Sequence, residues 1–123
     1  MYLFDVAAHH GRWLAVRQAT VATNVSNANT PGFKAQEVQP FEQVFERTRL
    51  TLSATQAGHI EGGGTDLRAY GTRASEPWDV THSGNSVSLE QEMLKAGEVN
   101  RSYALNTGVV RAFHRMYLAS LKG

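Results

Sequence analysis

The chain has 123 residues, enough for one domain, and 41% of them are hydrophobic, which allows only a modest core. It contains no cysteine, so disulfides, thiolate catalysis and cysteine-based zinc sites are excluded. A formal net charge of +1 argues against a dominant role in binding nucleic acid or a membrane surface.

The sequence shows neither a membrane span nor a targeting signal. No apolar run approaches the roughly 18 residues that a transmembrane helix needs. The N-terminus lacks the basic stretch and the apolar block of a secretory signal peptide. We therefore expect that, if the protein leaves the cytoplasm, it does so without a cleaved signal peptide.

Helical periodicity marks the N-terminal part of the chain. Asp5 is a good N-cap residue, and a helix is predicted from there to about Ala28. One face of this helix is poor in large side chains and is widened by neighbouring alanines, which is typical of one side of a close helix–helix contact. That face has alternating spacings of four and three residues and consists of Ala7, Gly11, Leu14, Gln18, Val21, Val25 and Ala28.

A turn motif ends this predicted helix. Thr30 precedes a proline and is biased away from the α region, while Pro31 has no amide hydrogen with which to continue a helix. Pro31-Gly32 fits the central positions of a type II turn, whose second residue needs φ > 0. Side-chain amides before the turn can bond backbone groups at the helix end. The motif comprises Asn24, Asn27, Asn29, Thr30, Pro31, Gly32 and Phe33.

The middle of the chain gives weaker signals. Residues 41–49 are predicted as a short helix or an irregular segment, and residues 50–53 as a short strand. Residues 54–86 are rich in glycine, and we expect them to be irregular and mobile in the isolated chain. Gly62-Gly63-Gly64 suggests a phosphate loop, but no Gly-Lys-Ser/Thr follows it, so a flexible connection is the better interpretation. Such a long loop is unusual in a compact monomer and favours an assembly protein.

The C-terminal part has the clearest helical periodicity. Ser88 is the expected N-cap, and Gln91 follows three residues later as in a capping box. A second apolar set that includes Phe113 makes the last turns apolar on most faces, so we expect other subunits to cover them. The main stripe keeps the four-three spacing through Leu89, Met93, Ala96, Asn100, Tyr103, Thr107, Val110, His114, Tyr117 and Leu121.

Large apolar side chains on the two helices are the predicted subunit interface, and no catalytic, cofactor or metal site is predicted. His9 and His10 are adjacent, so a regular helix points them about 100° apart and they cannot hold one metal ion together. No nucleophile–base pair accompanies the histidines. The predicted interface comprises Leu14, Val21, Val25, Leu89, Met93, Tyr103, Val110, Phe113, Tyr117 and Leu121.

Residues 24–35, Asn-Val-Ser-Asn-Ala-Asn-Thr-Pro-Gly-Phe-Lys-Ala, closely resemble the N-terminal signature of the bacterial flagellar rod and hook families. Residues 84–93, at the start of the last helix, resemble the proximal rod proteins within that group. The short length and the segment Ala57-Gly58-His59-Ile60 favour the same subgroup. Ser88 stands where many relatives carry an acidic residue, and the more usual Pro-Arg is missing before Ile60.

The resemblance implies a secreted, non-enzymatic subunit that polymerises into the torque-transmitting rod of the flagellar basal body, in the periplasm. It implies export by the flagellar type III apparatus, which passes unfolded chains without removing a signal peptide. The partners it implies are copies of the chain, other rod proteins, the rod-to-membrane-ring adaptor and the membrane ring. It implies no nucleic acid, no small-molecule substrate and no cofactor.

The expected fold is mainly α, with long N-terminal and C-terminal helices packing as a coiled-coil-like pair within a helical assembly. We expect residues 1–35 and 88–123 to form one discontinuous helical domain around an irregular, partly extended middle, residues 36–87. A soluble helical adaptor or export chaperone is an alternative that fits the two stripes but not the glycine-rich middle. An enzyme is a further alternative that no motif supports.

Overall fold

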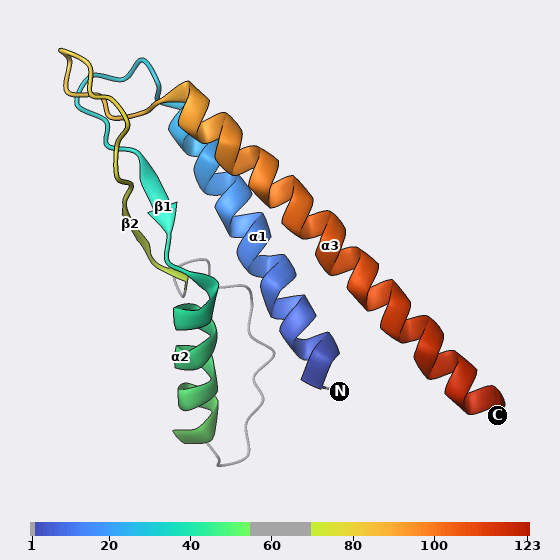
Figure 1. Ribbon diagram of the computed structural model, residues 1–123. Coiled ribbons are helices and arrows are strands. Elements are labelled where there is room, and N and C mark those ends of the chain that lie inside the picture. The colour runs from blue at the N-terminus through green and yellow to red at the C-terminus, as the bar shows by residue number, and fades with distance from the viewer. Residues whose placement is uncertain (1, 55–69) are drawn as a thin grey trace.

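The computed structural model describes residues 2–54 and 70–123, and two long helices dominate it. α1 spans Tyr2–Ser26 and α3 spans Leu89–Lys122. They run antiparallel, with the end of α1 beside the start of α3, and they diverge toward the chain termini (Figure 1). Between them the chain forms β1 (Gln36–Val38), α2 (Phe41–Ala54) and β2 (Thr72–Ala74). The mainly helical fold with two long terminal helices is confirmed.

The contact between α1 and α3 uses the expected face of α1. Ala7, Leu14 and Val21 from the predicted stripe are buried there. On α3 the residues that face inward are mostly polar, and they include Glu92 and Lys95. The four-three stripe of α3 does not face α1. Its residues, such as Met93, come one position after the inward-facing ones, such as Glu92, and neighbouring helical residues point about 100° apart.

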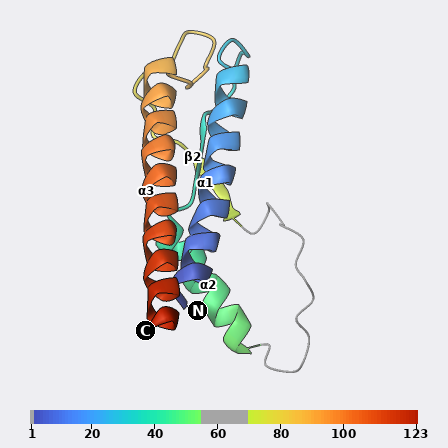
Figure 2. The same ribbon diagram turned by 90° about the vertical axis from the view of Figure 1, so that its right-hand side faces the viewer.

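A small mixed layer packs against α1, and its strands lie behind the two long helices in the view of Figure 2. β1 and β2 form an antiparallel pair in which Glu37 lies opposite Arg73. The core of this layer comprises Val38, Val44 and Tyr70, with Trp13 partly buried against it. The Trp13 indole N–H also donates to the Gln39 carbonyl at 2.8 Å, so one side chain joins α1 to the chain between β1 and α2.

The structure corrects three boundaries. Residues 50–53 continue α2 rather than forming a strand, because the helical period that starts at Phe41 and buries Val44 runs on. α1 starts before Asp5 and ends at Ser26 rather than Ala28. Within the segment expected to be irregular, residues 72–74 form a strand. The glycine run 62–64 and the segment 57–60 lie outside the described residues.

The turn after α1 has the predicted form. Gly32 has φ +74°, in the left-handed region that the third residue of a type II turn requires. The Phe33 N–H donates to the Thr30 carbonyl at 3.2 Å and closes the turn. A Cβ at Gly32 would meet nothing within 4 Å, so the requirement for glycine is conformational rather than steric.

Two glycine substitutions should therefore have opposite effects. Gly32→Ala should lower the free energy of unfolding by about 1–2 kcal/mol, since a Cβ strains the left-handed backbone. Gly108→Ala, inside α3 and also with nothing within 4 Å of the added Cβ, should raise it by about 0.5–1 kcal/mol. Urea unfolding followed by circular dichroism measures both. Equal effects would show that the turn does not demand glycine.

Candidate assembly interface

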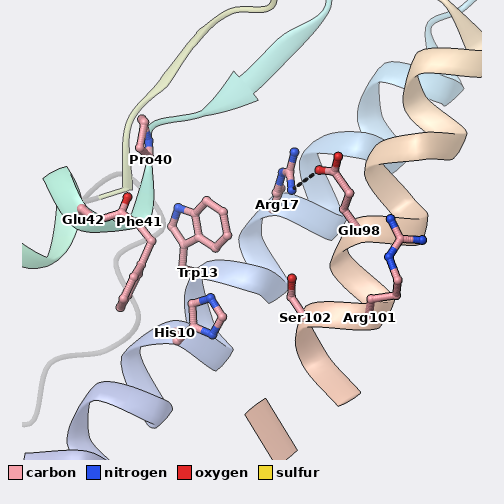
Figure 3. Close-up of a pocket in the computed structure, with 9 residues that line it drawn as sticks. All are labelled: His10, Trp13, Arg17, Pro40, Phe41, Glu42, Glu98, Arg101 and Ser102. Atoms are coloured by element: carbon pink, nitrogen blue, oxygen red, sulfur yellow. Dashed lines mark ion pairs between the residues drawn. The ribbon is translucent and has the colours of Figure 1, made fainter. Parts of the chain in front are cut away.

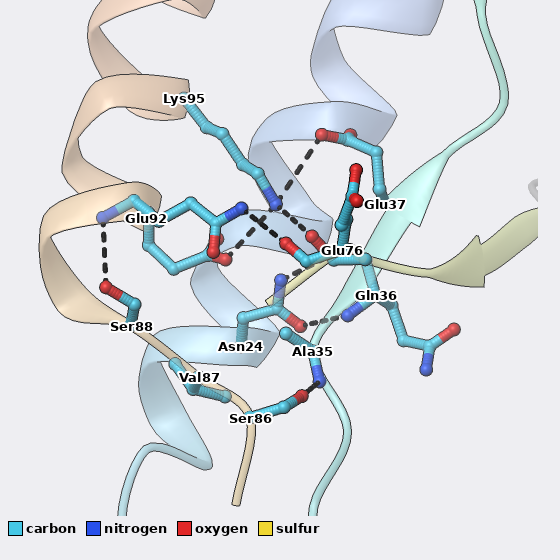
Figure 4. Close-up of polar contacts among 12 residues, drawn as sticks. Asn24, Ala35, Gln36, Glu37, Glu76, Ser86, Val87, Ser88, Glu92 and Lys95 are labelled. Atoms are coloured by element: carbon cyan, nitrogen blue, oxygen red, sulfur yellow. Dashed lines mark hydrogen bonds and ion pairs between the residues drawn. The ribbon is translucent and has the colours of Figure 1, made fainter. Parts of the chain in front are cut away.

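The side chain of Asn24 fixes the path of the chain after the turn. It is fully buried on the last turn of α1. Its Nδ2 donates to the Gln36 carbonyl at 2.8 Å, and its Oδ1 accepts from the Gln36 N–H at 2.9 Å (Figure 4). The amide thus satisfies both backbone groups of one residue, as a neighbouring strand would. It ties the start of β1 to α1.

Asn85 makes the matching contact from the segment before α3. This side chain is also buried, and its Nδ2 donates to the carbonyls of Asn27 at 2.7 Å and Thr30 at 2.8 Å. Both acceptors lie where α1 has ended, so their carbonyls lack helical partners. Its Oδ1 accepts from the Val87 N–H at 2.8 Å. Sequence patterns do not reveal Asn85, because the carbonyls to which it donates, those of Asn27 and Thr30, lie more than 50 residues away.

The next residue adds a second tie between the same segments. Ser86 Oγ accepts from the Ala35 N–H at 2.8 Å (Figure 4). The Ser86 N–H also donates to the Phe33 carbonyl at 3.0 Å. Together, Asn24, Asn85 and Ser86 join the turn motif to the start of β1 and to the segment before α3. We call these three residues the polar clasp.

The remaining residues of the turn motif play smaller parts. Asn27 Nδ2 donates to the Thr23 carbonyl at 2.9 Å, and Thr30 Oγ1 donates to Asn27 Oδ1 at 3.1 Å. The Gly32 N–H donates to the Ser83 carbonyl at 2.9 Å. Pro31 and Asn29 are exposed, and Phe33 is half-buried. Asn29 makes no side-chain hydrogen bond within the described part of the chain.

The N-terminus of α3 is capped as expected, with one difference. The Gln91 N–H donates to Ser88 Oγ at 3.4 Å. The reciprocal bond of a capping box is absent among the described residues, because the Gln91 side chain instead donates to the Glu76 carbonyl at 2.9 Å. Gln91 therefore anchors the segment before α3 to its first turn.

Charged side chains join α1, β1 and α3 next to the clasp. Arg17 of α1 pairs with Glu37 of β1 through two contacts of 3.2 Å, and with Glu98 of α3 at 3.1 Å. Lys95 of α3 lies 3.6 Å from the Glu37 carboxylate and 3.3 Å from that of Glu92 (Figure 4). Glu37 therefore holds cations from both long helices.

The network shifts the pKa values of two members. Burial by itself would raise the pKa of Glu37, but the hydrogen bond and charge of Arg17, helped by the charge of Lys95, lower the pKa below 4.5. Burial would lower the pKa of Arg17, but Glu37 and Glu98 raise the pKa overall. Both shifts favour the charged forms, so these groups stay ionised and paired at neutral pH.

The predicted interface residues divide into two sets. Leu14 and Val21 are 1% and 5% exposed because they pack within the chain, between the long helices. Val25 is partly exposed at the end of α1. Those on α3 lie on the surface: Leu89, Met93, Tyr103, Phe113, Tyr117 and Leu121 are 46–73% exposed, and Val110 is half-buried.

The histidines near the N-terminus pack in an aromatic cluster. The His10 ring stacks on Trp13 with centroids 5.9 Å apart and meets the edge of Phe41 at 4.9 Å. His9 meets Phe45 at 5.8 Å, and burial together with the charge of Arg12 lowers the pKa of His9. Within residues 2–54 and 70–123, no three His, Asp or Glu side chains are placed to hold a metal ion.

Beside this cluster lies a polar pocket of about 410 Å³ between α1, α2 and α3 (Figure 3). Its walls include Trp13, Arg17 and Arg101, and the Arg17–Glu98 ion pair crosses one side. Next to it, an apolar groove of about 310 Å³ opens where the long helices diverge, lined in part by Val6, Phe41 and Leu105. In the part of the chain that the structure describes, no helix is long and apolar enough to cross a membrane.

Comparison with known proteins gives a consistent result. The family described as "Flagella basal body rod protein" matches residues 14–34. The chain is 41% identical over 125 residues to the flagellar basal body rod protein FlgB of Agrobacterium fabrum, covering 98% of this chain and 92% of that protein. The chain belongs to the flagellar basal body rod protein family. It is therefore a structural protein of the basal-body rod, and family members assemble with other rod proteins.

More distant rod proteins match over shorter lengths. FlgB of Borrelia hermsii is 28% identical over 115 residues, covering 85% of this chain and 84% of that protein. FlgB of Salmonella typhimurium is 25% identical over 104 residues, covering 78% and 75%. The stretch that the rod-protein family matches contains Leu14, Asn24 and the Thr30-Pro31-Gly32 turn. It thus coincides with the inward face of α1 and the turn that the polar clasp holds.

Loss of the Asn24 amide should destabilise the contact between α1 and β1. Asn24→Ala leaves the N–H and C=O of Gln36 without partners, so we expect the free energy of unfolding to fall by about 2–4 kcal/mol. Asn29→Ala is the matched control, since Asn29 is exposed, and it should change stability by less than about 0.5 kcal/mol. Thermal unfolding followed by circular dichroism compares them, and similar melting temperatures would contradict the role of Asn24.

The lowered pKa of Glu37 makes stability depend on pH. Its contribution is complete above the ordinary value of 4.5 and is lost as the pH falls through the lower value of the folded protein. Glu37→Gln should lower the free energy of unfolding at neutral pH by about 1–3 kcal/mol and flatten its decline in acid. Urea unfolding across this pH range measures both effects, with the exposed Glu42→Gln as control. An unchanged pH profile in Glu37→Gln would contradict the role of Glu37.

Proposed function

We propose that this rod subunit polymerises through the exposed stripe of α3, which becomes buried against helices of neighbouring subunits. The exposure of the stripe carries this proposal. Met93, Tyr103 and Leu121 are 73%, 58% and 66% exposed, and they lie on one face along the whole helix. An exposed apolar band of this length is characteristic of a surface that binds another protein.

Burial of the stripe supplies the energy for assembly. Each large apolar side chain that is buried contributes about 1.5–3 kcal/mol, so several on each subunit outweigh the cost of ordering and association. The stripe and the surface that receives it belong to different faces, so the contact is heterologous. Repeated around an axis without closing, such a contact builds a helical filament, which is the form of a rod.

The terminal segments and the middle then have separate tasks. Residues 1–35 and 88–123 form one helical unit that bundles with neighbouring subunits, and residues 36–87, part of which packs along the side of this unit, contact adjacent ones. The packing of α1 against α3, which we call the helix hairpin, supports this division. The polar clasp supports it as well, because it holds the chain where it passes from α1 into β1 (Figure 1). The resemblance of residues 84–93 to proximal rod proteins supports a place in the proximal part.

A place in the proximal rod implies where the subunit lies and which proteins it contacts. The rod stands in the periplasm, and the subunit contacts copies of itself, other rod proteins, the rod-to-membrane-ring adaptor and the membrane ring. It reaches the rod through the flagellar type III export apparatus without loss of a signal peptide. It has no catalytic role. The pairing of Glu37 with both Arg17 and Lys95 supports a structural use of these charged side chains.

Two neighbouring positions on α3 test the stripe. Tyr103 lies on it, whereas the neighbouring Ala104, which is also exposed, points about 100° away. Tyr103→Asp should place a charge in the subunit contact and abolish rod formation and swimming, because an unpaired buried charge is costly. Ala104→Asp should assemble normally. Both variants should retain the helicity of the free chain, because both positions are exposed.

The measurements are yield of basal bodies that contain the rod, swimming in soft agar, and export of the variant chain. Normal swimming of the Tyr103→Asp strain would refute the stripe as an interface. Loss of export itself would show that the substitution acts before assembly, and would equally remove the support for this assignment.

A further inference from the structure

The apolar groove next to the polar pocket is a recess on the side of the hairpin. Leu3 and Val6 of α1, Phe41 of α2, and Leu105 and Val109 of α3 form its walls. Leu105 is 69% exposed at its edge. With about 310 Å³, it lies at the small end of ligand pockets, which fits one aromatic anchor better than a whole helix.

The positively charged side chain of Arg101 lies beside the groove. Arg101 lines the adjoining polar pocket, and its neighbour Ser102 lines both recesses. Among the residues that the structure describes, Arg101 pairs with no carboxylate, whereas Arg17 in the same pocket is taken by Glu37 and Glu98. Of the two carboxylates that line this pocket, Glu42 lies on the opposite rim and Glu98 of α3 is paired with Arg17, so an acidic ligand group would be attracted to Arg101.

The segment 76–80, Glu-Pro-Trp-Asp-Val, has the complementary chemistry. All five residues are exposed; the Trp78 side chain is 61% accessible, and the segment carries two carboxylates and no cation. Both ends are anchored: the Ser75 N–H donates to the Ala35 carbonyl at 2.8 Å, and the Thr81 N–H donates to the Asn85 carbonyl at 3.0 Å. A loop held in place presents its aromatic ring at a low entropic cost of binding.

This segment cannot reach the groove of its own chain. The Glu76 carbonyl accepts from Gln91 at 2.9 Å, which holds the segment at the first turn of α3. From Gln91 to Leu105 the helix rises about 21 Å. The segment also lies toward the end of the hairpin where α1 finishes, away from the chain termini (Figure 1). Only another molecule can bring the two surfaces together.

We propose that the apolar groove binds residues 76–80 of a second copy of this chain, with the Trp78 ring in the groove and the Asp79 carboxylate on Arg101. The contact joins different surfaces of the two copies, so it is heterologous and can repeat. This inference rests on the proposed polymerisation and adds to it a second contact, separate from the α3 stripe. Trp is the residue type most often found as the anchor of a protein interface.

A charge exchange tests the pairing in the purified full-length chain. Sedimentation equilibrium should show self-association of the unaltered chain. Arg101→Glu and Asp79→Arg should each weaken it by about tenfold or more, and the double variant should return to within about threefold of the unaltered chain. Chains carrying only one change each should form mixed pairs, since the two reversed sites attract. Trp78→Ala should weaken association without altering charge.

Glu90→Arg is the matched control, because Glu90 is an exposed carboxylate on the first turn of α3, outside the segment. It should leave association unchanged. The proposal is overturned if the unaltered chain stays monomeric at about 1 mM, where even a weak complex forms. It is also overturned if the double variant is no better than the single ones, or if only a different rod protein occupies the groove.

The Tyr103→Asp variant separates this inference from the proposed function. If that substitution abolishes association and rod formation while the charge exchange has no effect, the stripe is the interface and the groove is not. If the charge exchange behaves as expected while Tyr103→Asp assembles normally, the groove contact stands and the proposed use of the stripe fails.

Discussion

Asn24 bonds both the N–H and the C=O of Gln36, and the course of the whole chain depends on this contact. An α-helix that stops leaves backbone groups without partners, and a strand at a sheet edge does the same. The buried Asn24 amide bonds the backbone groups of the strand, and the Asn85 amide bonds the carbonyls that follow the helix end. Because β1 is then held against α1, Glu37 comes within reach of Arg17 and Lys95. The ion pairs that hold the hairpin closed thus follow from the position of β1.

The face of α3 that packs against α1 is mostly polar and its outer face is rich in apolar side chains, which is the reverse of a helix in an isolated globular protein. Glu92 is fully buried at the contact with α1, whereas the neighbouring Met93 is 73% exposed. A polar seam is costly to bury unless its groups are paired, and here they are largely paired with one another. Paired charges at this contact give the subunit a defined shape without burying the large apolar side chains of α3. Those side chains remain exposed, and we propose that they make the contacts with other subunits.

The ties between α1 and α3 lie mainly toward the end of α1, whereas the exposed apolar side chains of α3 continue to its last turns, an arrangement that suits assembly. α1 and the start of α3 are joined by the clasp and the ion pairs, whereas the last turns of α3 diverge from α1 (Figure 1). In that region Phe113 and Leu118 are about half exposed. A rod that transmits torque needs stiff elements whose surfaces lock to those of their neighbours. The end where α1 meets the start of α3 supplies the stiffness. The last turns of α3 supply apolar surface on a helix that is already formed.

The sequence by itself determined the features that depend on neighbouring residues: the two long helices, the inward face of α1 at Leu14 and Val21, the Ser88 cap and the turn at Gly32. Each follows from local periodicity or local backbone preference, and the family resemblance also rested on a local motif. The sequence could not show the partner of Asn85, the network around Glu37, the extent of α2 or the outward orientation of the α3 stripe. Tertiary structure decided these, because they depend on residues far apart in the chain: Asn85 and Asn27 are separated by 58 positions. A shift of one residue turns a helix by about 100°, so periodicity finds a stripe without revealing which neighbour covers it.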